Sequence, residues 1–103
     1  MKYRFAAPAL DEYERAAEYY DTCEPGLGAE FVHATDEEIA FVLEFPEASP
    51  RILTPRPWIV RKRLLRRFPI ALCYIVEDNT AVILAVAHGK RRPGYWLRRL
   101  RKL

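Results

Sequence analysis

The feature that most constrains the fold is an unbroken run of seven apolar residues, 81–87, in a chain of 103 residues. An apolar run of this length between turn-forming residues is typical of a β-strand that is buried on both faces. We therefore expect this strand at the centre of a sheet. Chemically active residues follow at once: His88, Lys90, Arg91, Arg92 and Tyr95. Because groups at the end of a rigid strand are well placed to bind or react, this end is the expected functional edge.

Two further strands are predicted directly before this one. Residues 58–65 alternate with a period of two, which places Arg61 and Arg63 together on one face. Residues 70–76 are almost entirely apolar. Short turns rich in Pro, Asp and Asn separate these segments from each other and from the strand at 81–88, so the sequence predicts an antiparallel meander.

The first half of the chain predicts a short strand and two helices. Residues 2–6 are aromatic-rich and typical of an edge strand. Apolar residues recur at three- and four-residue steps from 10 to 20 and again within 29–45, and a Pro-Gly pair separates the two stretches. This pattern predicts a helical hairpin. The proline-rich residues 46–57 form a connector, and the length of the chain favours one domain over residues 1–103.

Charge is distributed unevenly along the chain. Residues 1–50 hold 12 of the 14 acids and 3 of the 17 bases, whereas residues 51–103 hold 14 bases and 2 acids. The two halves therefore carry net charges of −9 and +12. This asymmetry favours a basic surface that binds an anionic partner, either nucleic acid or an acidic protein segment. The alternative is a basic face that is solvated or paired with the acidic helices of the same chain.

Several segments, in this order and at this spacing, resemble the RelE/ParE superfamily of toxins from bacterial type II toxin–antitoxin systems. The matching segments are Glu18-Tyr19-Tyr20, Pro25-Gly26-Leu27-Gly28-Ala29-Glu30-Phe31, Val60-Arg61-Lys62-Arg63-Leu64-Leu65, Arg67-Phe68-Pro69-Ile70-Ala71-Leu72-Cys73-Tyr74, Ile83-Leu84-Ala85-Val86-Ala87-His88 and Arg91-Arg92-Pro93-Gly94-Tyr95-Trp96. Together with the N-terminal strand they cover most of the chain.

The resemblance implies an α+β fold in which the N-terminal helical hairpin packs on a twisted antiparallel β-sheet. Residues 94–103 then form a short basic C-terminal helix or tail. It also implies a cognate acidic antitoxin that wraps the toxin. RelE-like members cut mRNA on the ribosome, and ParE-like members inhibit DNA gyrase without cutting nucleic acid. The chain is therefore expected to be a ribosome-dependent mRNA endoribonuclease, a gyrase inhibitor or an inactive toxin-like interaction module.

Metal-free RNA cleavage needs proton transfer and stabilisation of phosphate charge. A His near neutral pKa transfers protons, an Arg holds phosphate oxygens, and a Tyr stacks on a base or joins proton transfer. The predicted catalytic residues are His88, Arg91 and Tyr95, and the predicted anion-binding residues are Arg61, Arg63, Lys90 and Arg92. No carboxylate lies near this cluster in the sequence. The structural alternatives are a His that caps the strand end, a simple anion patch, and a tyrosine that packs the tail.

The sequence offers little support for a cofactor, a metal site or a membrane span. Cys23 and Cys73 are far apart and lack a paired spacing or a His cluster, so reduced thiols are expected and no zinc site. No apolar run approaches the ~20 residues that cross a bilayer. The N-terminal residues have no signal-peptide core, which favours a cytoplasmic protein.

Overall fold

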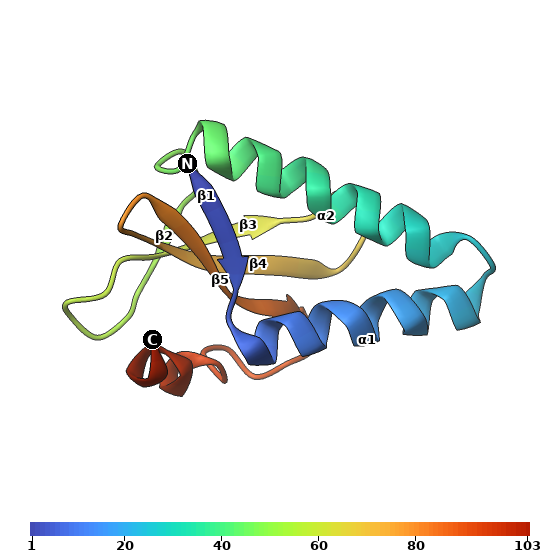
Figure 1. The fold of residues 1–103 in the computed structure, drawn as a ribbon. Helices are drawn as coiled ribbons and strands as arrows, with labels where there is room; N and C mark the ends of the chain where they lie inside the picture. Colours follow the sequence, from blue (N-terminus) through green and yellow to red (C-terminus); the bar gives the residue numbers. More distant parts are fainter.

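The structure, a computed structural model, describes residues 1–103 and contains a helical hairpin, a five-stranded sheet and a C-terminal 3₁₀ helix (Figure 1). In chain order the elements are β1 (Lys2–Phe5), α1 (Ala7–Cys23), α2 (Leu27–Glu44), β2 (Arg51–Ile52), β3 (Val60–Leu64), β4 (Ile70–Glu77), β5 (Thr80–His88) and η1 (Leu97–Lys102). The predicted α+β class, the hairpin and the three-stranded meander are confirmed.

The strand order in the sheet is β1-β5-β4-β3-β2. β5 is therefore an interior strand, but β4 rather than β5 occupies the middle. The predicted antiparallel sheet is confirmed for β2 to β5 and needs one correction: β1 pairs parallel to β5, with Lys2 opposite Thr80 and Phe5 opposite Ile83. A period-two pattern records which side chains are buried and carries no information on strand direction. The helix that follows β1, α1, packs against the same strand, β5.

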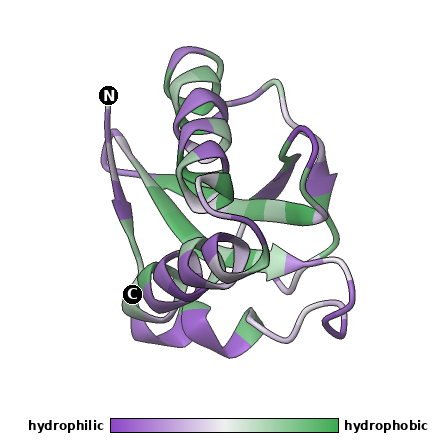
Figure 2. Cartoon of the chain, turned by 90° about the vertical axis from the view of Figure 1, so that its right-hand side faces the viewer, coloured by the Kyte–Doolittle hydropathy of each residue, from purple (hydrophilic) through white to green (hydrophobic).

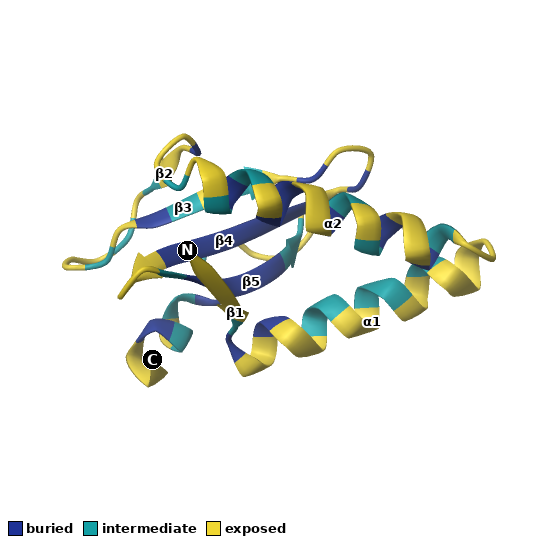
Figure 3. Ribbon diagram, turned by 45° about the horizontal axis from the view of Figure 1, so that its top comes forward, coloured by how far each residue is buried: buried dark blue, intermediate teal, exposed yellow.

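Two hydrophobic cores lie on opposite faces of the sheet, and β4 and β5 are buried between them (Figure 3). The first, the helix-side core, is covered by α1 and α2. Its buried members include Phe31, Ile39, Val42, Leu72, Tyr74 and Ile83. The second, the C-terminal core, is covered by the end of the chain. Its buried members are Val60, Cys73, Ile75, Val82, Leu84, Ala85, Trp96 and Leu100.

The hairpin turn is fixed by one carboxylate and one close approach. Asp21 accepts hydrogen bonds from the backbone amides of Gly26 and Gly28, at 3.0 and 3.1 Å, and so caps the start of α2. A Cβ at residue 28 would lie 2.5 Å from the carbonyl oxygen of Ala17, so only glycine allows the helices to approach this closely. The apolar faces of both helices then turn toward the sheet, and their polar faces turn outward (Figure 2).

A basic pocket at the end of β5

A pocket of about 470 Å³ lies where β5 ends, against the ends of β3 and β4 and residues 91–97. Its floor is mainly apolar, and its basic lining residues are Lys62, His88, Arg91 and Arg92, with no Asp or Glu among the lining residues. Of the cluster predicted after this strand, His88, Arg91, Arg92 and Tyr95 line one cavity, whereas Lys90 is exposed and is not among the lining residues. A pocket with an apolar floor and only basic charge suits a ligand that is anionic and partly apolar.

His88 is tied to the backbone of the turn that follows β5. Its Nδ1 accepts a hydrogen bond of 3.1 Å from the backbone amide of Lys90, and its carbonyl accepts one of 3.0 Å from the amide of Arg91. Gly89 donates to the carbonyl oxygen of Pro69, which ties this turn to the turn before β4. His88 thus caps the strand end, as the structural alternative predicted, and only Nε2 of its ring lacks a protein partner.

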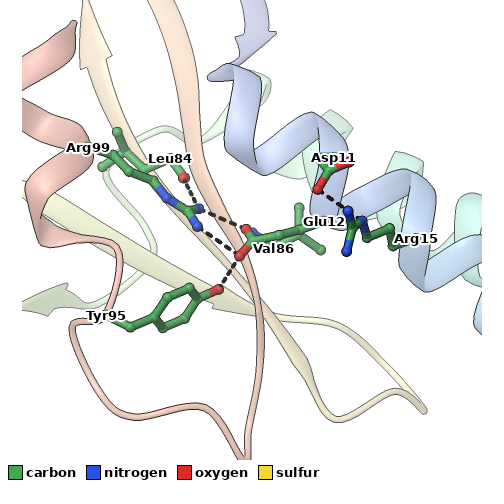
Figure 4. A network of polar contacts seen from close by, with 7 residues as sticks. All are labelled: Asp11, Glu12, Arg15, Leu84, Val86, Tyr95 and Arg99. Atoms are coloured by element: carbon green, nitrogen blue, oxygen red, sulfur yellow. Dashed lines mark hydrogen bonds and ion pairs between the residues drawn. The ribbon is translucent and has the colours of Figure 1, made fainter.

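Tyr95 belongs to a polar network, the Glu12 clasp, which comprises Glu12, Tyr95 and Arg99 (Figure 4). The Tyr95 hydroxyl donates to Glu12 Oε2 at 2.6 Å, and the Arg99 guanidinium donates to both carboxylate oxygens at 2.8 and 2.9 Å. The backbone amide of Val86 donates to Glu12 Oε1 at 3.0 Å, and Arg99 also donates to the carbonyl of Leu84 at 2.9 Å. The clasp therefore joins α1, β5 and the C-terminal segment.

The clasp changes the acid–base properties of its members. Burial alone would raise the pKa of Glu12, but hydrogen bonds from Arg99, Tyr95 and the Val86 amide outweigh burial and hold that pKa below its usual value. Burial, reinforced by the hydrogen bond to Glu12, raises the pKa of Tyr95 well above that of a free tyrosine. The hydrogen bond to Glu12 likewise raises the pKa of Arg99. At neutral pH the clasp is a carboxylate, a neutral phenol and a guanidinium.

Sequence reasoning missed Glu12, which lies 83 positions before Tyr95 and 87 before Arg99. A weak signal was present, because Glu12 stands between Ala9 and Ala16 on the side of α1 that faces the protein. An acid in that position needs a buried partner. The helical pattern identifies this need but not the partner that meets it.

Arg91 is held against the clasp by an aromatic contact. Its guanidinium carbon lies 3.9 Å from the centroid of the Tyr95 ring, and that of Arg99 lies 5.2 Å away. A cation over a tyrosine ring is stabilised by about 0.5–1 kcal/mol at an exposed site. Arg91 is exposed and forms no ion pair, so its charge remains available to a ligand.

Arg61 and Arg63 are not brought to this pocket. Alternation along β3 turns them toward α2 and the connector, while Lys62 between them lines the pocket. The Arg63 Nε donates to Glu38 at 2.7 Å, and its guanidinium lies over a phenylalanine ring of α2. Arg61 donates to two backbone carbonyls of the connector at 2.9 and 3.0 Å. Both arginines are therefore held by bonds within the fold, outside the pocket.

Part of the charge asymmetry is neutralised within the chain. Three ion pairs join acids of the first half to bases of the second half: Glu12 with Arg99, Glu38 with Arg63 and Glu30 with Arg67. These pairs account for 3 of the 14 bases in the second half. The alternative of internal pairing thus explains a minority of the basic charge.

The structure contains no group of three or more His, Cys, Asp or Glu side chains placed to hold a metal ion. Cys23 is exposed and Cys73 is buried, where burial raises the pKa of its thiol to about 11. A thiol with that pKa is not a nucleophile near neutral pH. None of the helices combines the length and the apolar character needed to cross a lipid bilayer.

Comparison with known families identifies the fold and the family. The family described as "ParE toxin of type II toxin-antitoxin system, parDE" matches residues 3–93. The chain belongs to this family. A solved ParE-like fold, described as "Chromosomal ParDE TA system from P. aeruginosa", superposes with a TM-score of 0.71 at 17% identity and covers 85% of this chain and 95% of that one. At this identity the likeness shows the fold alone. No curated protein matches the chain.

The family match ends before the C-terminal part of this protein that the clasp holds in place. Residues 3–93 include Glu12 and Arg91, but Tyr95, Trp96 and Arg99 lie beyond them. The cover of the C-terminal core is therefore built largely from residues outside the family match.

Proposed function

We propose that this ParE-family chain is the toxin of a toxin–antitoxin pair and that it inhibits DNA gyrase by binding, without cleaving nucleic acid. Family membership supports the toxin role. Gyrase as the target follows the behaviour of ParE-like members of the superfamily that the sequence resembles. The non-enzymatic mode rests on the state of the residues that RNA cleavage would need.

The observation that carries the non-enzymatic mode is the engagement of Tyr95. Its hydroxyl is committed to Glu12, and Arg91 lies over its ring. A phenol with a strongly raised pKa that already donates to a carboxylate is a poor base for a ribose hydroxyl. Of the two predicted catalytic residues that could transfer a proton, His88 and Tyr95, His88 keeps an unpartnered ring nitrogen, Nε2, whereas the Tyr95 hydroxyl is bound to Glu12. One such group does not supply both proton transfers of RNA cleavage.

The deciding experiment compares two activities of the purified toxin. We expect inhibition of gyrase-catalysed supercoiling of a relaxed plasmid and no new 5′ ends when translated mRNA is examined by primer extension. Ribosome-dependent cleavage without an effect on supercoiling would overturn the proposal in favour of the endoribonuclease.

The variant His88→Ala sharpens this test. If His88 transfers a proton during cleavage, its loss lowers the cleavage rate about 10²–10⁴-fold while RNA binding persists. If the toxin acts by binding gyrase, supercoiling inhibition changes only through affinity. The matched control is His33→Ala, because His33 is exposed on α2 and pairs only with Glu37 at 3.6 Å.

An acidic antitoxin is the proposed partner of the basic pocket. The pocket joins an apolar floor to cations and lacks acids, so a segment with apolar anchors and carboxylates fits it. Co-expression with the adjacent small open reading frame should give a stable complex, and expression of the toxin alone should slow growth. Normal growth at high soluble expression, with no complex formed, would contradict the toxin–antitoxin assignment.

A further inference from the structure

We propose that the C-terminal segment, residues 90–102, binds the phosphate backbone of double-stranded DNA. This segment contains seven bases and no acid: Lys90, Arg91, Arg92, Arg98, Arg99, Arg101 and Lys102. Arg99 alone is in an ion pair, with Glu12, and the other six are exposed. Lys90, Arg91 and Arg92 lie within the family match, and the other four bases lie beyond its end.

The segment holds these cations on a rigid support. Trp96 and Leu100 are 4% exposed and pack in the C-terminal core, while Arg99 is fixed by the clasp. Residues three apart in a 3₁₀ helix lie above one another with a rise of about 2 Å per residue, so Arg98 and Arg101 form one row about 6 Å apart along the axis. Both are exposed. A ligand that binds this row does not have to order the backbone first.

The surroundings of this row favour phosphate over protein carboxylates. Both residues of the row are arginines, whose planar guanidinium donates two parallel hydrogen bonds to a phosphate or to a carboxylate, so the preference must come from the surroundings of the row. Neither Arg98 nor Arg101 lines the apolar pocket, and Leu100 of the same helix is buried in the C-terminal core, so the row lies outside the apolar lining that would receive the anchors of a protein segment. An acidic protein segment needs such anchors for affinity, whereas a DNA backbone does not.

Glu12 is the acid that the segment is shown to bind, and Arg99 neutralises it within the clasp. The inference deepens the proposed function, because an inhibitor of an enzyme that acts on DNA gains affinity if it also contacts the DNA. The test below omits gyrase, so that the two proposals can fail separately.

The experiment measures fluorescence anisotropy of labelled duplexes of two unrelated sequences with the purified toxin at several salt concentrations. Each phosphate contact contributes about −0.9 to the slope of log K against log salt. We expect the double variant Arg98→Ala/Arg101→Ala to weaken binding equally for both sequences and to make the slope shallower by about 2. The Arg98→Gln/Arg101→Gln pair replaces it if the alanine pair lowers the melting temperature.

The matched control removes the same charge from another place. Arg51 and Arg56 are exposed and form no ion pair, so Arg51→Ala/Arg56→Ala should leave the slope nearly unchanged. Equal effects of the two double variants would reduce the binding to net charge and overturn the proposal. So would the absence of duplex binding at 50 mM salt (about the low end of such measurements). Displacement of the duplex by poly-glutamate of equal charge would also overturn the proposal, because it would indicate that Arg98 and Arg101 bind an acidic protein rather than DNA.

Discussion

The two faces of the sheet are covered in different ways. On one face, α1 and α2 bring an aromatic cluster in which Phe31 contacts Tyr13, Tyr20 and Phe68, with ring centroids 5.4–5.8 Å apart. On the other face, a short C-terminal segment places Trp96 over the core and is held by the Glu12 clasp.

The difference concerns what holds each cover in place. A two-helix cover buries enough apolar surface to stay closed by packing. A short 3₁₀ helix buries far less, so its position depends on a few directional bonds to one carboxylate. We infer that loss of an apolar group unfolds the helical side with the whole domain, whereas loss of one polar group opens the C-terminal side locally. The following predictions test this contrast.

The largest expected effect is that of Phe31→Ala on the helix-side core. Phe31 is fully buried, and large-to-small substitutions of buried phenylalanine typically lower the free energy of unfolding by about 3–5 kcal/mol. Urea denaturation should show this loss as one cooperative transition. Leu10→Ala on the exposed surface of α1 is the control, and we expect it to cost below about 0.5 kcal/mol. Equal losses for the two variants would contradict the packing described above.

The next largest effect should be that of Glu12→Gln, which we expect to lower the free energy of unfolding by about 3 kcal/mol. The Glu12 and Arg99 side chains are 15% and 16% exposed, and removal of one partner of a largely buried pair leaves the other charge uncompensated. Hydrogen exchange should accelerate at the Arg99 amide, which donates to the carbonyl of Trp96. Glu14→Gln, an exposed acid on the same helix, is the control. Unchanged protection at Arg99 would show that the clasp does not hold the segment.

Tyr95→Phe should have a smaller effect and lower the free energy of unfolding by about 2 kcal/mol. The change removes only the hydroxyl, and a hydrogen bond to a charged group is typically worth about 1.5–3 kcal/mol. The ring stays in place beneath Arg91. Tyr3→Phe is the control, since Tyr3 is 44% exposed and its hydroxyl forms no hydrogen bond within the protein. A melting temperature equal to that of the native protein would mean that Arg99 alone closes the clasp.

The smallest expected effect is the change in the stability of the folded protein as the pH varies near neutrality. The pKa of Glu12 is lowered in the folded state, so the unfolded chain binds more protons in mild acid. The stabilisation is therefore present above the usual value of 4.5 and is lost as the pH falls through the lower folded pKa. Denaturation midpoints below pH 5 (about half a unit above that value) should fall less steeply for Glu12→Gln than for the native protein. Parallel curves would contradict the lowered pKa.

The sequence by itself determined the local elements. Alternation and helical periodicity located β3, β4, β5 and both helices, because these patterns record which side chains are buried. The apolar run at 81–87 did become a strand buried on both faces. Four residues of the cluster at its end, His88, Arg91, Arg92 and Tyr95, lie around one pocket, since residues close in sequence remain close in space.

Only the tertiary structure decided the direction of β1, the partners of Arg61 and Arg63, and the place of Glu12. Each depends on which distant segments meet, and periodicity carries no information about partners. Arg63 finds its carboxylate 25 positions away and Tyr95 finds its own 83 positions away. The Tyr95 hydroxyl that the sequence offered as a catalytic group is for this reason a donor to a buried carboxylate. The desolvated carboxylate of Glu12 needs every donor within reach, and the fold brings it Tyr95 and Arg99.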